Sequence, residues 1–96
     1  MNRAVVLEQL AKSKPTLAAR YGVTDIALFG SMVRDAARVD SDIDILVSFD
    51  GPATSERYFG VQFFLEDLLG RSIDLVTDKA LRSELRPYVE KAAIHV

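Results

Sequence analysis

The chain has 96 residues, a formal net charge of −2 and 49% hydrophobic residues, a composition typical of one small globular domain over residues 1–96. It has no cysteine, which excludes disulfide bonds and thiolate metal sites, and no block of Lys and Arg of the kind that tight, unspecific nucleic-acid binding requires. No apolar stretch reaches membrane-spanning length, and the first residues lack the apolar core of a signal peptide. We therefore expect a cytoplasmic protein with no membrane contact and no stable nucleic-acid binding.

The chain opens with helical periodicity. Apolar residues at helical spacing predict a helix over residues 2–12, with Asn2 as a candidate cap. Lys14-Pro15 is expected to interrupt this helix, and a short helical segment over 16–21 follows, closed by Gly22.

Two apolar runs in the middle of the chain predict strands. Residues 24–29 form a short apolar run bounded by turn signals, and residues 42–49 form a second run that Asp50-Gly51-Pro52 ends. Between them, residues 31–37 predict a brief helix and residues 39–41 a turn.

The remaining sequence predicts a helix over 55–69 with Gly70 as its stop, and a strand over 73–77. Asp78 is expected to cap a final helical region, Pro87 fits the first turn of its last helix, and residues 94–96 suit a short last strand. This alternation predicts an α/β or α+β domain with a small β-sheet flanked by helices.

Several residues in the second half of the chain permit two interpretations of their role. They are the phenylalanines of the helix over 55–69, two later arginines and a histidine. We expect Phe59, Phe63 and Phe64 in the core, with an aromatic surface for a partner as the alternative. We expect Arg82 and Arg86 on a solvated helix face, with a face toward a substrate or partner as the alternative, and we expect His95 to be structural rather than catalytic.

A pair of aspartates opens the second predicted strand. Asp42 and Asp44 are two residues apart, so on a strand their side chains point to the same side while Ile43 and Ile45 face a core. Paired carboxylates repel each other unless a cation lies between them, which indicates a divalent metal ion. A solvated turn would give the same short pattern, so the pair alone decides little.

Two further features make the metal interpretation more specific. Gly30 and Ser31 follow the first predicted strand, and their backbone N–H groups and hydroxyl suit a phosphate. Asp74 stands inside the apolar run 73–76, where an unpaired buried charge would be costly. A metal ion beside a phosphate-binding turn indicates phosphoryl or nucleotidyl transfer.

The pattern Gly30-Ser31, ten intervening residues, Asp42-Ile43-Asp44 and a later Asp74 resembles the signature of the DNA polymerase β-type nucleotidyltransferase superfamily. The short length and the run over 29–47 resemble the minimal nucleotidyltransferases (MNT) of prokaryotes, the antitoxin halves of HEPN–MNT toxin–antitoxin modules. The likeness extends from about Val23 to the C-terminus and implies a polymerase β-like core with a small mixed sheet.

The resemblance also implies roles for individual residues. Asp42, Asp44 and Asp74 would be the catalytic carboxylates that hold two Mg²⁺ ions, with Asp74 also helping to deprotonate the attacking hydroxyl. Gly30 and Ser31 would hold the nucleotide phosphates.

Two more residues are candidates for the nucleotide site. Arg34 could contact a phosphate or form a salt bridge to Asp35 or Asp40, and Ser41 could orient a carboxylate, although shaping the turn is the favoured role for it. The family pattern has a small residue and then glycine around position 35, whereas here Val33 and Asp35 surround Arg34, and Asp35 adds negative charge near the phosphates.

The function that the resemblance implies is transfer of AMP from ATP to a hydroxyl, expected to be that of a tyrosine, on a cognate HEPN ribonuclease toxin. The toxin would be both partner and substrate, because so short a chain is expected to leave no room for an acceptor-binding domain. We therefore expect a hetero-oligomer of the two proteins. The alternatives are an antitoxin that masks the toxin by binding alone and an enzyme of the aminoglycoside-modifying type.

Overall fold

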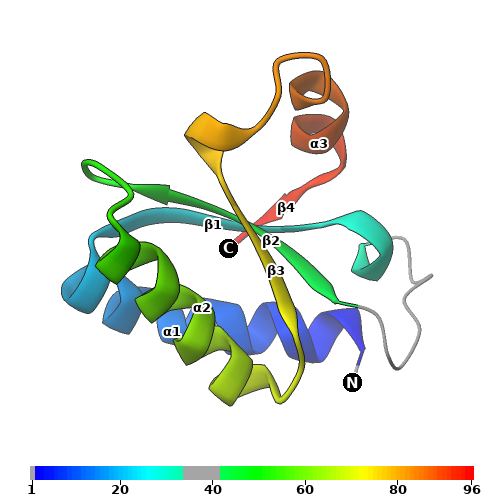
Figure 1. Cartoon of the computed structure of the whole chain (residues 1–96). Helices are drawn as coiled ribbons and strands as arrows, with labels where there is room; N and C mark the ends of the chain where they lie inside the picture. The colour runs from blue at the N-terminus through cyan, green and yellow to red at the C-terminus, as the bar shows by residue number, and fades with distance from the viewer. Residues whose placement is uncertain (1, 34–41) are drawn as a thin grey trace.

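The computed structural model describes residues 2–33 and 42–96, and in this part of the chain helices and strands alternate (Figure 1). The elements, in chain order, are α1 (Arg3–Tyr21), β1 (Val23–Phe29), the 3-10 helix η1 (Gly30–Met32), β2 (Ile43–Phe49), α2 (Ser55–Leu69), β3 (Ile73–Thr77), the 3-10 helix η2 (Asp78–Ala80), α3 (Arg86–Ala92) and β4 (Ile94–His95). The predicted strands are thus confirmed to within about a residue at each end.

The strands form one mixed sheet in the order β3-β2-β1-β4. β1 pairs antiparallel with β2 and β4, whereas β2 and β3 are parallel and are joined by the crossover helix α2. Helices α1 and α2 cover one face of the sheet, and α3 lies on the other side (Figure 1). The expected small mixed sheet flanked by helices is therefore confirmed.

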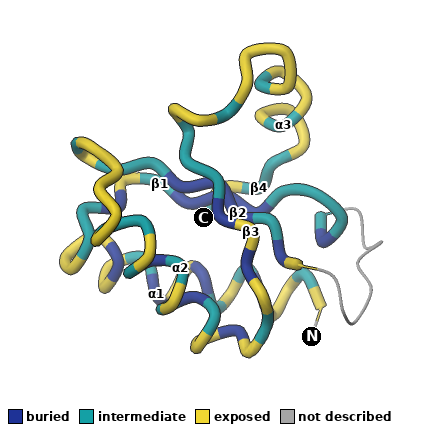
Figure 2. Tube along the Cα trace, in the orientation of Figure 1, coloured by how far each residue is buried: buried dark blue, intermediate teal, exposed yellow. Residues whose placement is uncertain are grey.

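The core lies between the sheet and the α1–α2 layer (Figure 2). Strand residues at alternate positions supply one side of it, because successive side chains of a strand point to opposite faces. The helices supply the other side, and the fully buried members include Val6, Leu10, Leu17, Ile26, Leu28, Ile43, Ile45, Val61 and Leu65.

The expected break at Lys14-Pro15 is wrong, because α1 continues through Pro15 as a single helix. Proline removes one backbone hydrogen bond from a helix interior, but Leu10 and Leu17 on either side are both fully buried against the sheet. Tertiary packing therefore keeps the helix together. Its predicted ends are confirmed: Asn2 accepts a hydrogen bond from Val5 N at 3.0 Å, and Gly22 has a φ of 72°.

The last third of the chain differs from expectation in its caps. Thr77, not Asp78, caps η2, because its hydroxyl accepts a hydrogen bond from Ala80 N at 3.2 Å. Asp78 instead accepts a hydrogen bond from Arg86 Nη1 at 2.8 Å, which links η2 to α3. Pro87 lies in the first turn of α3, as predicted.

The expectation that Phe59 and Phe63 belong to the core is also wrong. Their side chains are 49% and 59% exposed, whereas Val61 and Leu65 occupy the buried face of α2. Phe64 is half-buried against the core, as expected. Helical spacing alone did not separate the two apolar stripes of this helix, because phenylalanines extend the apolar surface beyond one face.

The open edge of β3 is covered by side chains from α2. Tyr58 Oη donates a hydrogen bond to Leu75 O at 2.6 Å, and Gln62 Nε2 makes a longer one, 3.5 Å, to Ile73 O. These contacts hold α2 directly beside the edge strand.

No helix among the described residues is long and apolar enough to cross a membrane.

Candidate active site

Asp44 and Asp74 lie side by side on neighbouring strands. They are register partners in the parallel pairing of β2 and β3, on the sheet face opposite α1 and α2. Their side chains are within hydrogen-bonding reach of each other, and Asp44 is half-buried while Asp74 is exposed. The sequence predicted that these carboxylates belong together, and the parallel register provides the contact.

Asp42 completes the group that the sequence singled out. It is exposed and directly precedes β2, and its charge acts on Asp44. Burial first, then the Asp74 charge and hydrogen bond, and last the Asp42 charge raise the pKa of Asp44 from 3.8 to about 6. The charges of Asp74 and Asp42 thus both disfavour the ionised form of Asp44, which is the electrostatic setting in which a bound cation is favourable.

The Gly30–Ser31 turn lies directly against Asp44. Phe29, the last residue of β1, is the register partner of Asp44, so the chain that follows β1 passes over this carboxylate. The backbone of Ser31 hydrogen-bonds to the Asp44 carboxylate and lowers its pKa, in opposition to the larger effects of burial and Asp74.

Gly30 is required at this point for two reasons. Its φ of 76° lies in the left-handed region, and a Cβ added there would overlap the carboxylate of Asp44. The close approach of turn and carboxylate therefore depends on the absence of a side chain. The candidate phosphate-binding turn and the Asp44–Asp74 pair are thus joined through the Asp44 carboxylate.

The donor chemistry of this site fits Mg²⁺, which takes carboxylate oxygens as ligands. In the described part of the chain, however, no three Asp, Glu, His or Cys side chains are already arranged to enclose a metal ion. Arg34 and Ser41, the two other predicted nucleotide contacts, lie outside the described residues, as does Asp35.

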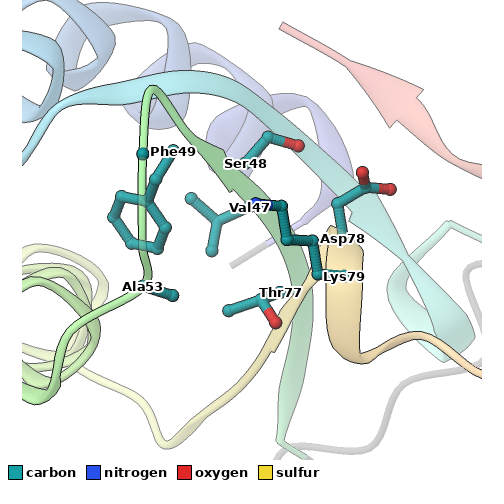
Figure 3. Close-up of a pocket in the computed structure, with 8 residues that line it drawn as sticks. Val47, Ser48, Phe49, Ala53, Thr77, Asp78 and Lys79 are labelled. Atoms are coloured by element: carbon teal, nitrogen blue, oxygen red, sulfur yellow. The ribbon is translucent and has the colours of Figure 1, made fainter.

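A small hollow lies at the opposite end of β2 and β3 (Figure 3). It has a volume of about 60 Å³ and is lined by Val47, Ser48, Phe49, Gly51, Ala53, Thr77, Asp78 and Lys79. Sites for ligands of nucleotide size usually have several hundred Å³. The hollow is therefore too small for a nucleotide, and it adjoins neither Asp44 nor Asp74, which are at the other ends of these strands.

The remaining candidates have structural contacts. His95 Nδ1 is 2.8 Å from Asp25 Oδ2, a contact that joins β4 to β1. Arg86 donates from both Nη atoms to Asp78, one bond reaching the carboxylate and one the backbone oxygen, both at 2.8 Å. The sequence analysis did not identify this contact between Arg86 and Asp78. The two residues are close in the sequence, and that proximity was a usable signal.

Comparison with known proteins places this site in a family. The pattern of the nucleotidyltransferase domain matches residues 10–95. The protein adenylyltransferase MntA of Thermococcus cleftensis is 38% identical over 87 residues, which cover 91% of this chain and 88% of the relative. The chain therefore belongs to the nucleotidyltransferase family.

Solved structures agree with this assignment. A protein assigned as a minimal nucleotidyltransferase is 35% identical and superimposes with a TM-score of 0.82, over 98% of this chain and 95% of the other. A complex of a tri-AMPylated HEPN toxin of Shewanella oneidensis with an MNT antitoxin contains a chain that superimposes with a TM-score of 0.60. That match covers 98% of this chain and 67% of the other at 21% identity, and it supports the fold alone.

Proposed function

We propose that this protein transfers AMP from ATP to a hydroxyl group, that of a tyrosine, on a cognate HEPN ribonuclease toxin and thereby inactivates the toxin. The observation that carries the proposal is the contact of the Asp44–Asp74 pair with the Gly30–Ser31 turn. The kinship with a protein adenylyltransferase supports the same reaction, since 91% of this chain is covered by that relative.

Different residues of the chain have different roles in the proposed reaction. Gly30 and Ser31 would hold the phosphates of ATP, with Arg34 and Ser41 as further contacts, and Asp42, Asp44 and Asp74 would hold two Mg²⁺ ions. When bound, the ions neutralise the negative charge that develops as pyrophosphate leaves.

The bonds change at the α-phosphorus. The hydroxyl oxygen attacks this atom, the bond to the bridging oxygen of pyrophosphate breaks, and Asp74 accepts the hydroxyl proton. Asp74 is suited to this because it is exposed at the sheet edge, where an acceptor can reach it. We propose that the reaction takes place in the cytoplasm, where ATP is available, and within a complex of the chain and its toxin.

The test is the intact mass of the toxin. The HEPN protein encoded beside this gene is incubated with the chain, ATP and Mg²⁺, and one or more AMP-sized increments are expected. Asp42→Asn and Asp44→Asn should abolish them, and Glu84→Gln, which neutralises an exposed carboxylate away from the site, should not.

Two results would contradict the proposal. An unmodified toxin that is inhibited equally well by wild type and by Asp44→Asn would show that the chain masks the toxin by binding. Transfer of AMP to an aminoglycoside but not to the toxin would show a small-molecule enzyme.

A further inference from the structure

Two stacked aromatic rings on the outer face of α2 are exposed to solvent. The rings of Phe59 and Phe63 have their centroids 6.1 Å apart at an interplanar angle of 24°. Both side chains are about half exposed or more, while the core of this helix is filled by other residues. Exposed aromatic rings that stack together leave apolar surface in water, a feature typical of interaction sites.

The charged side chains of α2 that lie near these rings and form no ion pair are all carboxylates. Glu56, Glu66 and Asp67 each lie about one helical turn from Phe59 or Phe63. None of the three forms an ion pair with a cation in the described part of the chain. Arg57, the cation of the same helix, is occupied by Asp50 at 2.9 Å. We call Phe59, Phe63 and these three carboxylates the α2 aromatic patch.

The α2 aromatic patch adjoins the sheet edge that carries Asp74. Phe59 contacts Tyr58 edge to face, with centroids 5.2 Å apart, and Tyr58 hydrogen-bonds to Leu75 O in β3. β3 is the edge strand of the sheet, and Asp74 is exposed in it. Asp74 faces away from α2, so one partner that curves around this edge would reach both the α2 aromatic patch and the candidate active site.

We propose that the α2 aromatic patch is the docking surface for the toxin, and that the toxin meets it with an apolar centre and a rim of Lys and Arg. This inference rests on the proposed function. A ribonuclease must carry cationic side chains to bind the RNA backbone, so its surface complements the acidic rim. Buried aromatic rings commonly supply much of the binding energy of protein interfaces.

The charges argue against a second copy of this chain as the occupant. In a two-fold symmetric dimer the same surface meets itself, so the three carboxylates of one copy would face those of the other. Like charges at close range oppose association. A basic partner experiences the opposite effect.

The test measures the affinity of the chain for the HEPN protein encoded beside its gene, by calorimetry at two salt concentrations. Phe59→Ser with Phe63→Ser should weaken binding by at least tenfold, because both rings leave the interface. Glu66→Lys with Asp67→Lys should also weaken binding and should reverse its salt dependence. Tyr88→Ser, which removes a 75% exposed ring on α3, is the matched control and should leave the affinity unchanged.

Thermal unfolding shows whether each variant is folded. The charge reversal replaces no core residue, since Asp67 is exposed and Glu66 is partly buried, so it tests the surface even if the phenylalanine pair fails to fold. Unchanged affinity of the charge-reversed chain overturns the proposal. So does an equal loss with Tyr88→Ser, or no binding by the wild type. If the wild type forms a dimer, and the phenylalanine variant loses the dimer but still binds the toxin equally well, the surface belongs to a second copy of the chain. That result also overturns the proposal.

AMP transfer separates this inference from the proposed function. Docking predicts that the phenylalanine variant raises KM for the toxin by the same factor as Kd and leaves kcat unchanged. Transfer with an unchanged KM overturns the docking surface and leaves the proposed function standing. If the wild type binds the toxin but transfers no AMP, and both patch variants lose toxin binding, the proposed function is refuted and the docking surface is supported.

Discussion

The two faces of β2 differ in what they contribute to the protein. Ile43, Ile45 and Val47 point toward α1 and α2 and are at most 1% exposed. Asp44, between two of them in sequence, points the other way and meets Asp74 and the Gly30–Ser31 turn. Stability and chemistry are thus assigned to alternate residues of one strand, so substitutions one position apart should have separable effects.

The largest effect is expected on the open face. Asp44→Asn should lower the rate of AMP transfer by about 10³-fold, because it removes a proposed metal ligand and the negative charge at the centre of the site. The initial rate of AMP incorporation into the toxin measures this. A variant that keeps more than a tenth of the wild-type rate would mean that Asp44 is not a ligand.

The neighbouring residue should act on folding instead. Ile45→Ala leaves a cavity in the core and should lower the free energy of unfolding by about 3 kcal/mol. Chemical denaturation measures this loss, and the folded fraction should transfer AMP at nearly the wild-type rate. Loss of activity without loss of stability would contradict the separation of the two faces.

Gly30 and Gly70 form a matched pair for the turn that touches the open face. Both have positive φ, but a Cβ at Gly30 overlaps Asp44 whereas a Cβ at Gly70 meets nothing within 4 Å. Alanine at either position should cost about 1 kcal/mol of stability through backbone strain. Only Gly30→Ala should also slow AMP transfer, by about 10²-fold. Equal activity of the two variants would rule out a role for the close approach.

The smallest effect is the pH dependence of the metal-free protein. The pKa of Asp44 is raised from 3.8 to about 6 in the folded state, so the folded protein binds a proton more readily than the unfolded chain between these values. The resulting destabilisation is complete above pH 6 and is relieved as the pH falls toward 4. With EDTA present, we expect Tm to rise by a few degrees from pH 7 to pH 5, since partial exposure screens the repulsion.

The same measurement has an internal control. In Asp44→Asn the titrating group is absent, so its metal-free Tm at pH 7 should exceed that of the wild type, and the rise toward pH 5 should be smaller. A wild-type Tm that falls steadily from pH 7 to pH 5 would show that the carboxylates do not repel in the absence of metal.

Much of the fold followed from local patterns. Gly22 and Gly70 end helices where the sequence placed them, and the strands were visible as short apolar runs. The alternation around Asp44 predicted which side of β2 carries the carboxylate. These features depend on residues near one another in the sequence, which is why they could be predicted.

Features that depend on contacts between residues far apart in the sequence were harder to predict. Pro15 stays helical because buried leucines on both sides hold α1 against the sheet, and local propensity does not contain that information. The parallel register of Asp44 with Asp74 joins segments separated by α2. The exposure of Phe63 depends on which apolar stripe of α2 packs against the sheet, and the helix has two such stripes.

The side chains that reach the rim of β3 have a consequence for how this protein avoids aggregation. An edge strand with free backbone carbonyls is a template onto which a strand of another molecule can add, and repeated addition leads to fibrils. Here Tyr58 and Gln62 already occupy the outward carbonyls of Leu75 and Ile73. A foreign strand would have to displace both before it could extend the sheet, so growth at this edge is opposed while the side-chain surfaces beside it stay free for specific association.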